Sequence, residues 1–189
     1  MAVLVEALSV IVRRDAIDLR FNGGWRNFIE LVPNGTLCYE NELARVGFMS
    51  PEAVGGFCEL LYENGLEVFG NGEFIDAAVV DQVNGPTLPT SWLEFGKLQC
   101  DDDGNRVSAC WLFEGERKGA GLHFKSLEID LALPIDWTYA DSLSNKFEFV
   151  KNEDKNMRLK FLRRDLSSDI YFDNELGREV RLPHTKAGG

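Results

Sequence analysis

Five Asn-Gly pairs divide the first 85 residues of this 189-residue chain into short segments. The pairs begin at Asn22, Asn34, Asn64, Asn71 and Asn84. Asn and Gly both tolerate a positive φ, so each pair is a strong signal for a turn or for the end of a helix. We therefore expect the first half to be built from short helices and strands.

The first segments predict a buried strand, a helix and a second strand. Residues 2–12 form an apolar run that is typical of a buried strand, and residues 43–48 are expected to be extended. Between them, four apolar residues recur at helical spacing before Pro33, which ends a helix: Trp25, Phe28, Ile29 and Val32.

The strongest helix signal begins at Ser50. Ser50 suits the N-cap, Pro51 suits the first helical position, and Gly65 lies where a residue with left-handed backbone commonly ends a helix. The apolar face of this helix would hold Val54, Phe57, Cys58 and Leu61. Beyond it, strands at 66–69 and 74–83 are expected to form a hairpin around a Gly-Asn-Gly turn.

The second half has the strand signals that are typical of antiparallel pairing. Strands are expected at 92–99, 107–113, 122–131, 146–150 and 157–162, followed by a closing hairpin over 170–182. The prolines and the glycine of GPTLPTS, residues 85–91, indicate a linker before these strands.

These elements predict an α+β fold with a mainly antiparallel sheet, about two helices in the first half and a β-rich second half. The predicted units are an α+β subdomain at 1–84, the linker 85–91, a mainly antiparallel β subdomain at 92–183 and a flexible tail at 184–189. A single continuous domain is the alternative that a chain of this length leaves open.

The chain is acidic, with 20 Lys and Arg against 31 Asp and Glu and a formal net charge of -11. Such a charge repels nucleic-acid phosphates and the anionic cytoplasmic membrane surface, so neither is an expected partner. The opening run AVLVEALSVIV is interrupted by Glu6, and it lacks both the basic start of a signal peptide and the length of a spanning helix. We therefore expect a cytoplasmic protein.

The acidic excess lies in the first half, where residues 1–90 hold 5 Lys and Arg against 13 Asp and Glu. Three glutamates of the second predicted helix fall within about 40° of arc, opposite its apolar face: Glu52, Glu59 and Glu63. Gly55 and Gly56 weaken this helix by up to about 1 kcal/mol each relative to Ala, which favours close approach by another molecule. We predict that these glutamates, with Glu40 and Glu42, bind a basic protein; an ordinary solvated helix face is the alternative.

A rival hypothesis is a small-molecule binder or a small enzyme with a pocket between the two halves. Its candidate lining residues are three tryptophans of the second half, for which core packing is the ordinary alternative: Trp92, Trp111 and Trp137. The sequence contains no catalytic, cofactor or phosphate-binding motif. Our first hypothesis is therefore a non-enzymatic binding protein without a cofactor, in the manner of an immunity or antitoxin-type neutraliser.

Metal and disulfide chemistry find no support in the residue spacing. The four cysteines include no Cys-x-x-Cys pair, and the chain has only two histidines to complete a metal site. The stretch DDDGNR, residues 101–106, lacks the spacing of a calcium loop and predicts a tight hairpin turn. A two-residue turn at Asp103 and Gly104 would place Cys110 opposite Lys97, so we expect no disulfide with Cys100.

Several stretches resemble a scattered family of small bacterial proteins without assigned activity, of the sort carried on mobile, integron-type gene cassettes. The stretches are GGW at 23–25, PNGTLCYENELARVGFMSPEAV at 33–54, ENGL at 63–66 and YADSLSNKFEFV at 139–150. The resemblance carries over no catalytic residue. It implies a stand-alone bacterial protein of the cytoplasm.

Overall fold

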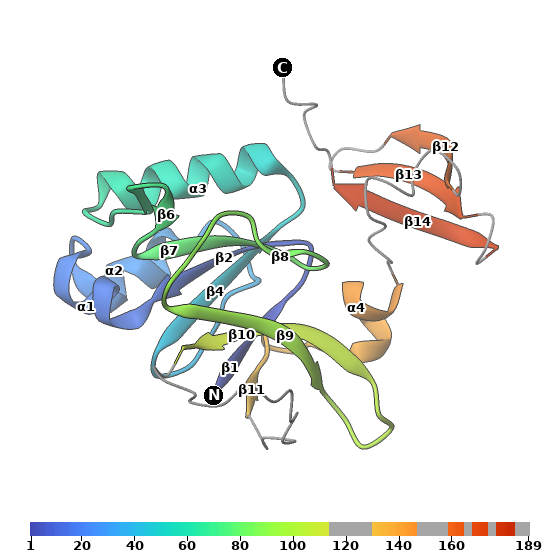
Figure 1. Ribbon diagram of the computed structural model, residues 1–189, viewed down its shortest axis with the longest axis horizontal. Coiled ribbons are helices and arrows are strands. Elements are labelled where there is room, and N and C mark those ends of the chain that lie inside the picture. The colour runs from blue at the N-terminus through green and yellow to red at the C-terminus, as the bar shows by residue number, and fades with distance from the viewer. Residues whose placement is uncertain (114–129, 147–158, 165–167, 174–176, 184–189) are drawn as a thin grey trace.

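The computed structural model describes residues 1–113, 130–146, 159–164, 168–173 and 177–183. These residues form an α+β fold with mainly antiparallel sheets (Figure 1), which confirms the predicted fold class. The first half holds three helices rather than about two. Among the described residues, no helix is both long enough and apolar enough to cross a membrane.

A five-stranded sheet forms the centre of the first half. Its strand order is β3 (Cys38–Tyr39), β4 (Leu43–Phe48), β2 (Leu8–Arg13), β7 (Ala77–Asp81) and β8 (Gly85–Pro86). All neighbouring strands in it are antiparallel. The predicted extended segment 43–48 is β4, and all six of its residues are buried.

A four-stranded sheet joins the start of the chain to later strands. Its order is β11 (Leu131–Ala132), β1 (Ala2–Val5), β10 (Arg106–Leu112) and β9 (Leu93–Gln99), and β1 is parallel only to β11. The pairing of β1 with β10 therefore crosses the predicted linker 85–91, whose first two residues are β8. The division into subdomains at 1–84 and 92–183 stays a prediction.

The first predicted strand, 2–12, is wrong in its continuity, because the chain changes sheets within it. Strand β1 ends at Val5 and β2 begins at Leu8, and between them Ala7 has a φ of 50°. A positive φ at a residue other than Gly is uncommon and reverses the local direction of the backbone. Apolar residues on both sides of this kink hide it in the sequence.

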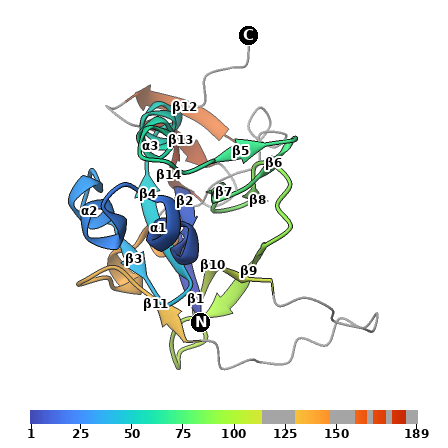
Figure 2. The same cartoon turned by 90° about the vertical axis from the view of Figure 1, so that its left-hand side faces the viewer.

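The two sheets and the helices stack in layers, with α3 on one side of the central sheet and the β1–β9–β10–β11 sheet on the other (Figures 1 and 2). Successive side chains of β2 alternate between these layers, as a strand requires. Val10 and Val12 pack in the core beneath the helices, while Ile11 packs in the core between the two sheets. Both faces of the central sheet are therefore buried.

Helix α3, Pro51–Glu63, confirms the strongest helix prediction. The Ser50 Oγ accepts a hydrogen bond from the Ala53 N–H at 3.2 Å, and Pro51 occupies the first turn. Gly65 follows the helix with a φ of 100°, and a Cβ there would lie 2.6 Å from the Arg20 carbonyl oxygen. Only glycine satisfies both demands.

Two shorter helices precede α3. Helix α2, Gly24–Leu31, confirms the helix predicted before Pro33. Helix α1, Arg14–Arg20, was not predicted, because its seven residues bury only Ala16 and Ile17 and so carry almost no periodic pattern.

The hairpins of the chain follow their turn signals, with one error of register. Strands β5 (Phe69–Gly70) and β6 (Glu73–Phe74) pair around the expected Gly-Asn-Gly turn. The expected strand 74–83 is divided, however, because its larger part is β7, which pairs with β2 in the central sheet. In the β9–β10 hairpin, however, Cys110 pairs with Phe95 and not with Lys97. The loop is longer than two residues because the Asp101 carboxylate accepts hydrogen bonds from the backbone and the side chain of Asn105.

A separate three-stranded sheet closes the described chain, in the order β12 (Leu159–Arg164), β13 (Ser168–Asp173) and β14 (Arg178–Pro183). Its β13–β14 pair is the hairpin expected over 170–182. A 3-10 helix, η1 (Tyr139–Asp141), and a short helix, α4 (Leu143–Lys146), precede it. Most of the expected strands 122–131 and 146–150, and the tail 184–189, lie outside the described residues.

Candidate functional site

The kink between β1 and β2 gathers a network of buried polar groups. The Ala7 N–H donates to Gln82 Oε1 at 2.8 Å, and the Gln82 N–H donates to the Ala7 carbonyl oxygen at 2.9 Å. Ser108 Oγ on β10 donates to the Gln82 carbonyl oxygen at 2.5 Å. These bonds satisfy the backbone where the chain leaves one sheet for the other, which explains how the kink is tolerated in the interior.

Arg45 carries a guanidinium group into this network from β4. Its side chain is buried and donates to Ser9 Oγ at 2.9 Å, to the Thr36 carbonyl oxygen at 3.2 Å and to the Glu6 carbonyl oxygen at 3.1 Å. Burial lowers the pKa of this guanidinium, while Cys38 and Glu6 raise it. A Cβ at Gly47 would lie 2.5 Å from an Arg45 nitrogen, so the bare backbone of Gly47 gives the guanidinium its space.

The Glu6 carboxylate binds a distant segment to the kink. It accepts from Trp137 Nε1 at 3.3 Å, from the Ser144 N–H at 3.0 Å and from Ser144 Oγ at 2.7 Å. Hydrogen bonds to an ionised acceptor are stronger than those between neutral groups. Glu6 therefore holds residues 137–144 against the β1–β2 connection.

A pocket of about 470 Å³ lies between this segment and the first half of the chain. Its polar lining includes Glu6, Asn34, Thr36 and Arg45, and its apolar lining includes Phe48, Met49, Ala53, Pro134, Ile135, Trp137 and Leu143. The volume and the few convergent polar groups are within the range of small-molecule sites. We name it the Trp137 pocket.

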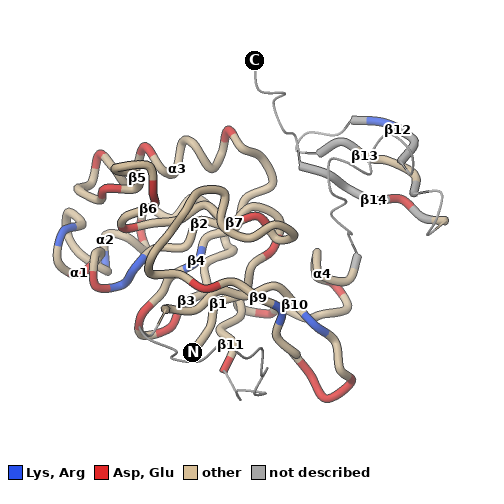
Figure 3. Tube along the Cα trace, in the orientation of Figure 1, with Lys and Arg blue, Asp and Glu red and all other residues tan. Residues whose placement is uncertain are grey.

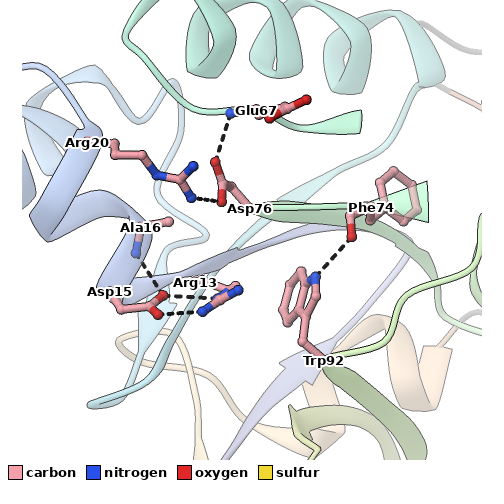
Figure 4. Close-up of polar contacts among 8 residues, drawn as sticks. All are labelled: Arg13, Asp15, Ala16, Arg20, Glu67, Phe74, Asp76 and Trp92. Atoms are coloured by element: carbon pink, nitrogen blue, oxygen red, sulfur yellow. Dashed lines mark hydrogen bonds and ion pairs between the residues drawn. The ribbon is translucent and has the colours of Figure 1, made fainter. Parts of the chain in front are cut away.

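Of the three predicted pocket tryptophans, Trp137 alone lines this pocket. The Trp92 indole donates to the Phe74 carbonyl oxygen at 3.1 Å (Figure 4), which ties β9 to the β6 strand. The Trp111 indole donates to Glu94 Oε2 at 2.5 Å across the β9–β10 pair. Both contacts are those of structural side chains.

A second pocket, of about 360 Å³, continues the first along the side of α3. It is lined by Pro33, Asn34, Phe48, Ala53, Gly56, Phe57 and Leu60, and it shares Asn34, Phe48 and Ala53 with the Trp137 pocket. Four of these residues come from α3, and Phe48 lies at the end of β4 just before it. We name this second pocket the α3 groove.

The predicted acidic residues divide into exposed and buried positions. Glu52, Glu59 and Glu63 are exposed on the outer side of α3, and Glu42 is exposed after β3. Glu40 is buried, at 5% exposure, and its Oε2 accepts from the Glu42 N–H at 3.0 Å. The Glu40 side chain is therefore turned into the protein, away from the exposed acidic surface.

No Lys or Arg occurs at positions 46–96, a stretch that contains eight acidic residues. Figure 3 shows the consequence on the fold, since α3 and the β5–β6 hairpin carry acidic positions and no basic ones. The basic residues of the first half lie instead on or near α1, α2 and β4. Beside the glutamates of α3, Tyr62 is exposed at 71%.

Metal and thiol chemistry have no assembled site in the described ranges. No group of three or more His, Cys, Asp or Glu side chains there could hold a metal ion. All four cysteines are free, and Cys38 and Cys110 are buried. Burial raises the pKa of the Cys58 thiol to about 11, so this group stays protonated and unreactive at neutral pH.

Sequence reasoning missed Glu6 and Arg45, although both carry a recognisable signal. Each is a charged residue inside an otherwise apolar strand run, AVLVEALSVIV for Glu6 and LARVGF for Arg45. A charged side chain in such a run must be paired or hydrogen-bonded, because burying it alone is costly.

Comparison of the chain with protein-family models, with curated proteins and with solved structures found no match.

Replacing Gly55 or Gly56 by Ala is expected to raise the free energy of unfolding by about 0.5–1 kcal/mol at each position. Both glycines are exposed in the middle of α3, and apart from the neighbouring backbone of the helix itself, a Cβ at either would meet no described atom within 4 Å. Urea denaturation of the two variants measures the change. Gly65→Ala is the contrasting control, since its positive φ and its contact with Arg20 predict a loss of stability.

Proposed function

We propose that this protein is a non-enzymatic binding protein that recognises a basic protein partner through the outer side of α3. The observation that carries the proposal is the exposed row of Glu52, Glu59 and Glu63 within a stretch, 46–96, that has no Lys or Arg. A surface of one sign attracts an oppositely charged partner and speeds its association. The exposed Tyr62 beside the row adds the type of side chain that is enriched at protein interfaces.

An immunity or antitoxin-type neutraliser is the functional class that we infer for this surface. Such proteins cover a basic partner by charge and shape and need no catalytic group of their own. We further propose that the protein is a cytoplasmic member of the gene-cassette class and that it binds neither nucleic acid nor a membrane. The net charge of -11 supports the expected absence of nucleic-acid and membrane partners. The residues of the stretches 33–54 and 139–150, which resemble gene-cassette proteins, support the class.

The experiment exchanges two charges on α3 and compares them with the same exchange elsewhere. Glu59→Lys with Glu63→Lys should abolish capture of a basic partner from the bacterial host at low salt, because attraction becomes repulsion. Asp102→Lys with Asp103→Lys, at the exposed tip of the β9–β10 hairpin, changes the net charge equally and should leave capture intact. The captured protein is then purified, and its association rate is measured against all three forms.

Equal binding of that partner by both double variants would show that α3 is an ordinary solvated face and would overturn the proposal. Both substitutions on α3 are at exposed positions, so the variant should keep the far-UV circular dichroism and the melting temperature of the parent.

A second candidate function, small-molecule binding, is favoured by the Trp137 pocket. Its volume of about 470 Å³, its indole wall and its few polar groups would suit a small ligand with an apolar body. The rival hypothesis of a pocket between the two halves is thus supported at Trp137, in a different place from Trp92 and Trp111.

A further inference from the structure

We propose that the α3 groove is the docking site for one amphipathic, basic helix of the partner. The inference rests on the proposed function and adds to it the shape of the segment that is recognised. Its apolar side chains would enter the groove, and its Lys and Arg side chains would lie along the glutamates of α3.

The geometry of α3 places an apolar flank directly beside the acidic row. With 100° per residue, Glu52, Glu59 and Glu63 share one narrow arc of the helix. Ala53, Gly56 and Leu60, which line the groove, follow within about 80° on one side of that arc. Gly56 has Glu52 and Glu59 as its i−4 and i+3 neighbours, and Leu60 has Glu63 at i+3, so the acidic row forms the rim of the groove.

The floor of the groove is aromatic and its edge is open. Phe48 and Phe57 are buried in contact with each other, with ring centroids 5.3 Å apart, and both line the groove. Gly56 stands at the edge without a side chain and with empty space where a Cβ would be. An incoming helix can therefore approach the α3 backbone closely at this position.

The polar groups of the groove favour a helical occupant over an extended one. Asn34 is the polar side chain of the lining, and its Nδ2 already donates to the Gly47 carbonyl oxygen at 2.9 Å. An extended peptide would lay its own N–H and C=O groups against this apolar wall without partners. A helix satisfies those groups internally and presents apolar side chains at i, i+3, i+4 and i+7.

Charge complementarity identifies the chemistry of that helix. The stretch 46–96, which supplies the acidic rim and five of the seven lining residues, contains no Lys or Arg, so an acidic segment would be repelled by the rim. A helix with one apolar face and one basic face matches both the floor and the rim. The Trp137 pocket shares Asn34, Phe48 and Ala53 with the groove and so lies directly beside it.

The test uses a fluorescent peptide of roughly five helical turns, built from Leu and Lys with the leucines on one face. We expect it to bind the wild-type protein in a salt-sensitive way. A peptide of the same composition with its leucines spread around the helix should bind more weakly by about tenfold or more, because it cannot fill the groove.

Two neighbouring glycines supply a matched pair of protein variants. Gly56→Trp fills the groove and should weaken binding of the amphipathic peptide by about tenfold or more, measured by fluorescence anisotropy. Gly55→Trp places the same side chain on the opposite flank of the acidic row and should change binding by less than about twofold. Leu60→Lys, which puts a positive charge in the groove, is the second variant and should weaken binding of the peptide as much as Gly56→Trp does.

The outcomes separate the groove from the charged surface. One outcome is that Gly56→Trp and Leu60→Lys bind the peptide as well as Gly55→Trp does, while the double variant Glu59→Lys with Glu63→Lys does not bind it. That outcome would overturn the groove proposal and leave the proposed function standing. If the charge exchange also has no effect, both proposals fail. The groove proposal would also be overturned if the peptide does not bind the wild-type protein. It would be overturned too if the wild type forms a dimer that Gly56→Trp dissociates, because the groove would then bind a second copy of this chain.

Discussion

Asp76→Ala is expected to lower the free energy of unfolding by about 3 kcal/mol, because it removes a fully buried carboxylate that accepts from Arg20 and from the Glu67 N–H. The Asp76 side chain is fully buried, and its carboxylate pairs with Arg20 of α1 (Figure 4). Its other oxygen accepts from the Glu67 N–H at 2.8 Å. The same residue therefore joins α1, the segment after α3 and the start of β7.

The loss should be large because two partners lose their acceptor at once. The partly buried Glu67 N–H would lose its acceptor, and the half-exposed Arg20 guanidinium would lose its ion pair. Urea denaturation followed by circular dichroism measures the change. Asp76→Asn keeps an acceptor of the same size and should cost less, while Asp102→Ala at the exposed hairpin tip should stay within about 0.5 kcal/mol of the parent. A cost for Asp76→Ala as small as that of Asp102→Ala would contradict this account.

Glu6→Ala is expected to release the segment around Trp137 and to lower the free energy of unfolding by about 3 kcal/mol. Glu6 is only 8% exposed and accepts three hydrogen bonds from residues that lie 131 and 138 positions away in the chain. Its removal leaves the Trp137 indole and the Ser144 N–H unpaired. It also removes the carboxylate that supports the charge on Arg45.

Hydrogen exchange measures this release directly. Amides of 135–146 should exchange faster in the variant, while those of β2 and β4 should keep their protection, since the central sheet does not depend on Glu6 for its own pairing. Glu94→Ala is a matched control, because it removes another carboxylate that accepts from a tryptophan indole, that of Trp111, but only between adjacent strands. If both variants leave 135–146 equally protected, Glu6 does not hold this segment.

The same variant bears on the second candidate function. The Trp137 pocket has Glu6 on one wall and the 134–143 segment on another, so release of that segment would take the pocket apart. The α3 groove is lined only by residues of 33–60 and should survive the change. Peptide binding should therefore persist in Glu6→Ala, whereas a ligand of the Trp137 pocket should be lost.

Local signals predicted the elements whose causes lie within a few residues. Ser50, Pro51 and Gly65 mark the two ends of α3, and the structure bears out all three roles. The row of Glu52, Glu59 and Glu63 follows from the helical period alone, so its exposure could be predicted once the helix was. The burial of Glu40 could not be predicted in this way, because it depends on the turn between β3 and β4.

The sequence by itself determined the fold class, α3 with its acidic row, and the turns that separate the short elements, because caps, helical spacing and tolerance of positive φ act between residues close in the chain. Only the tertiary structure decided that the first apolar run splits at Ala7 between two sheets, that Glu6 reaches Ser144, and that Phe48 meets Phe57 to floor a groove beside α3. These features depend on pairs of residues that are distant in sequence. An apolar or charged residue shows that it needs a partner, but packing of the whole chain selects which one it finds.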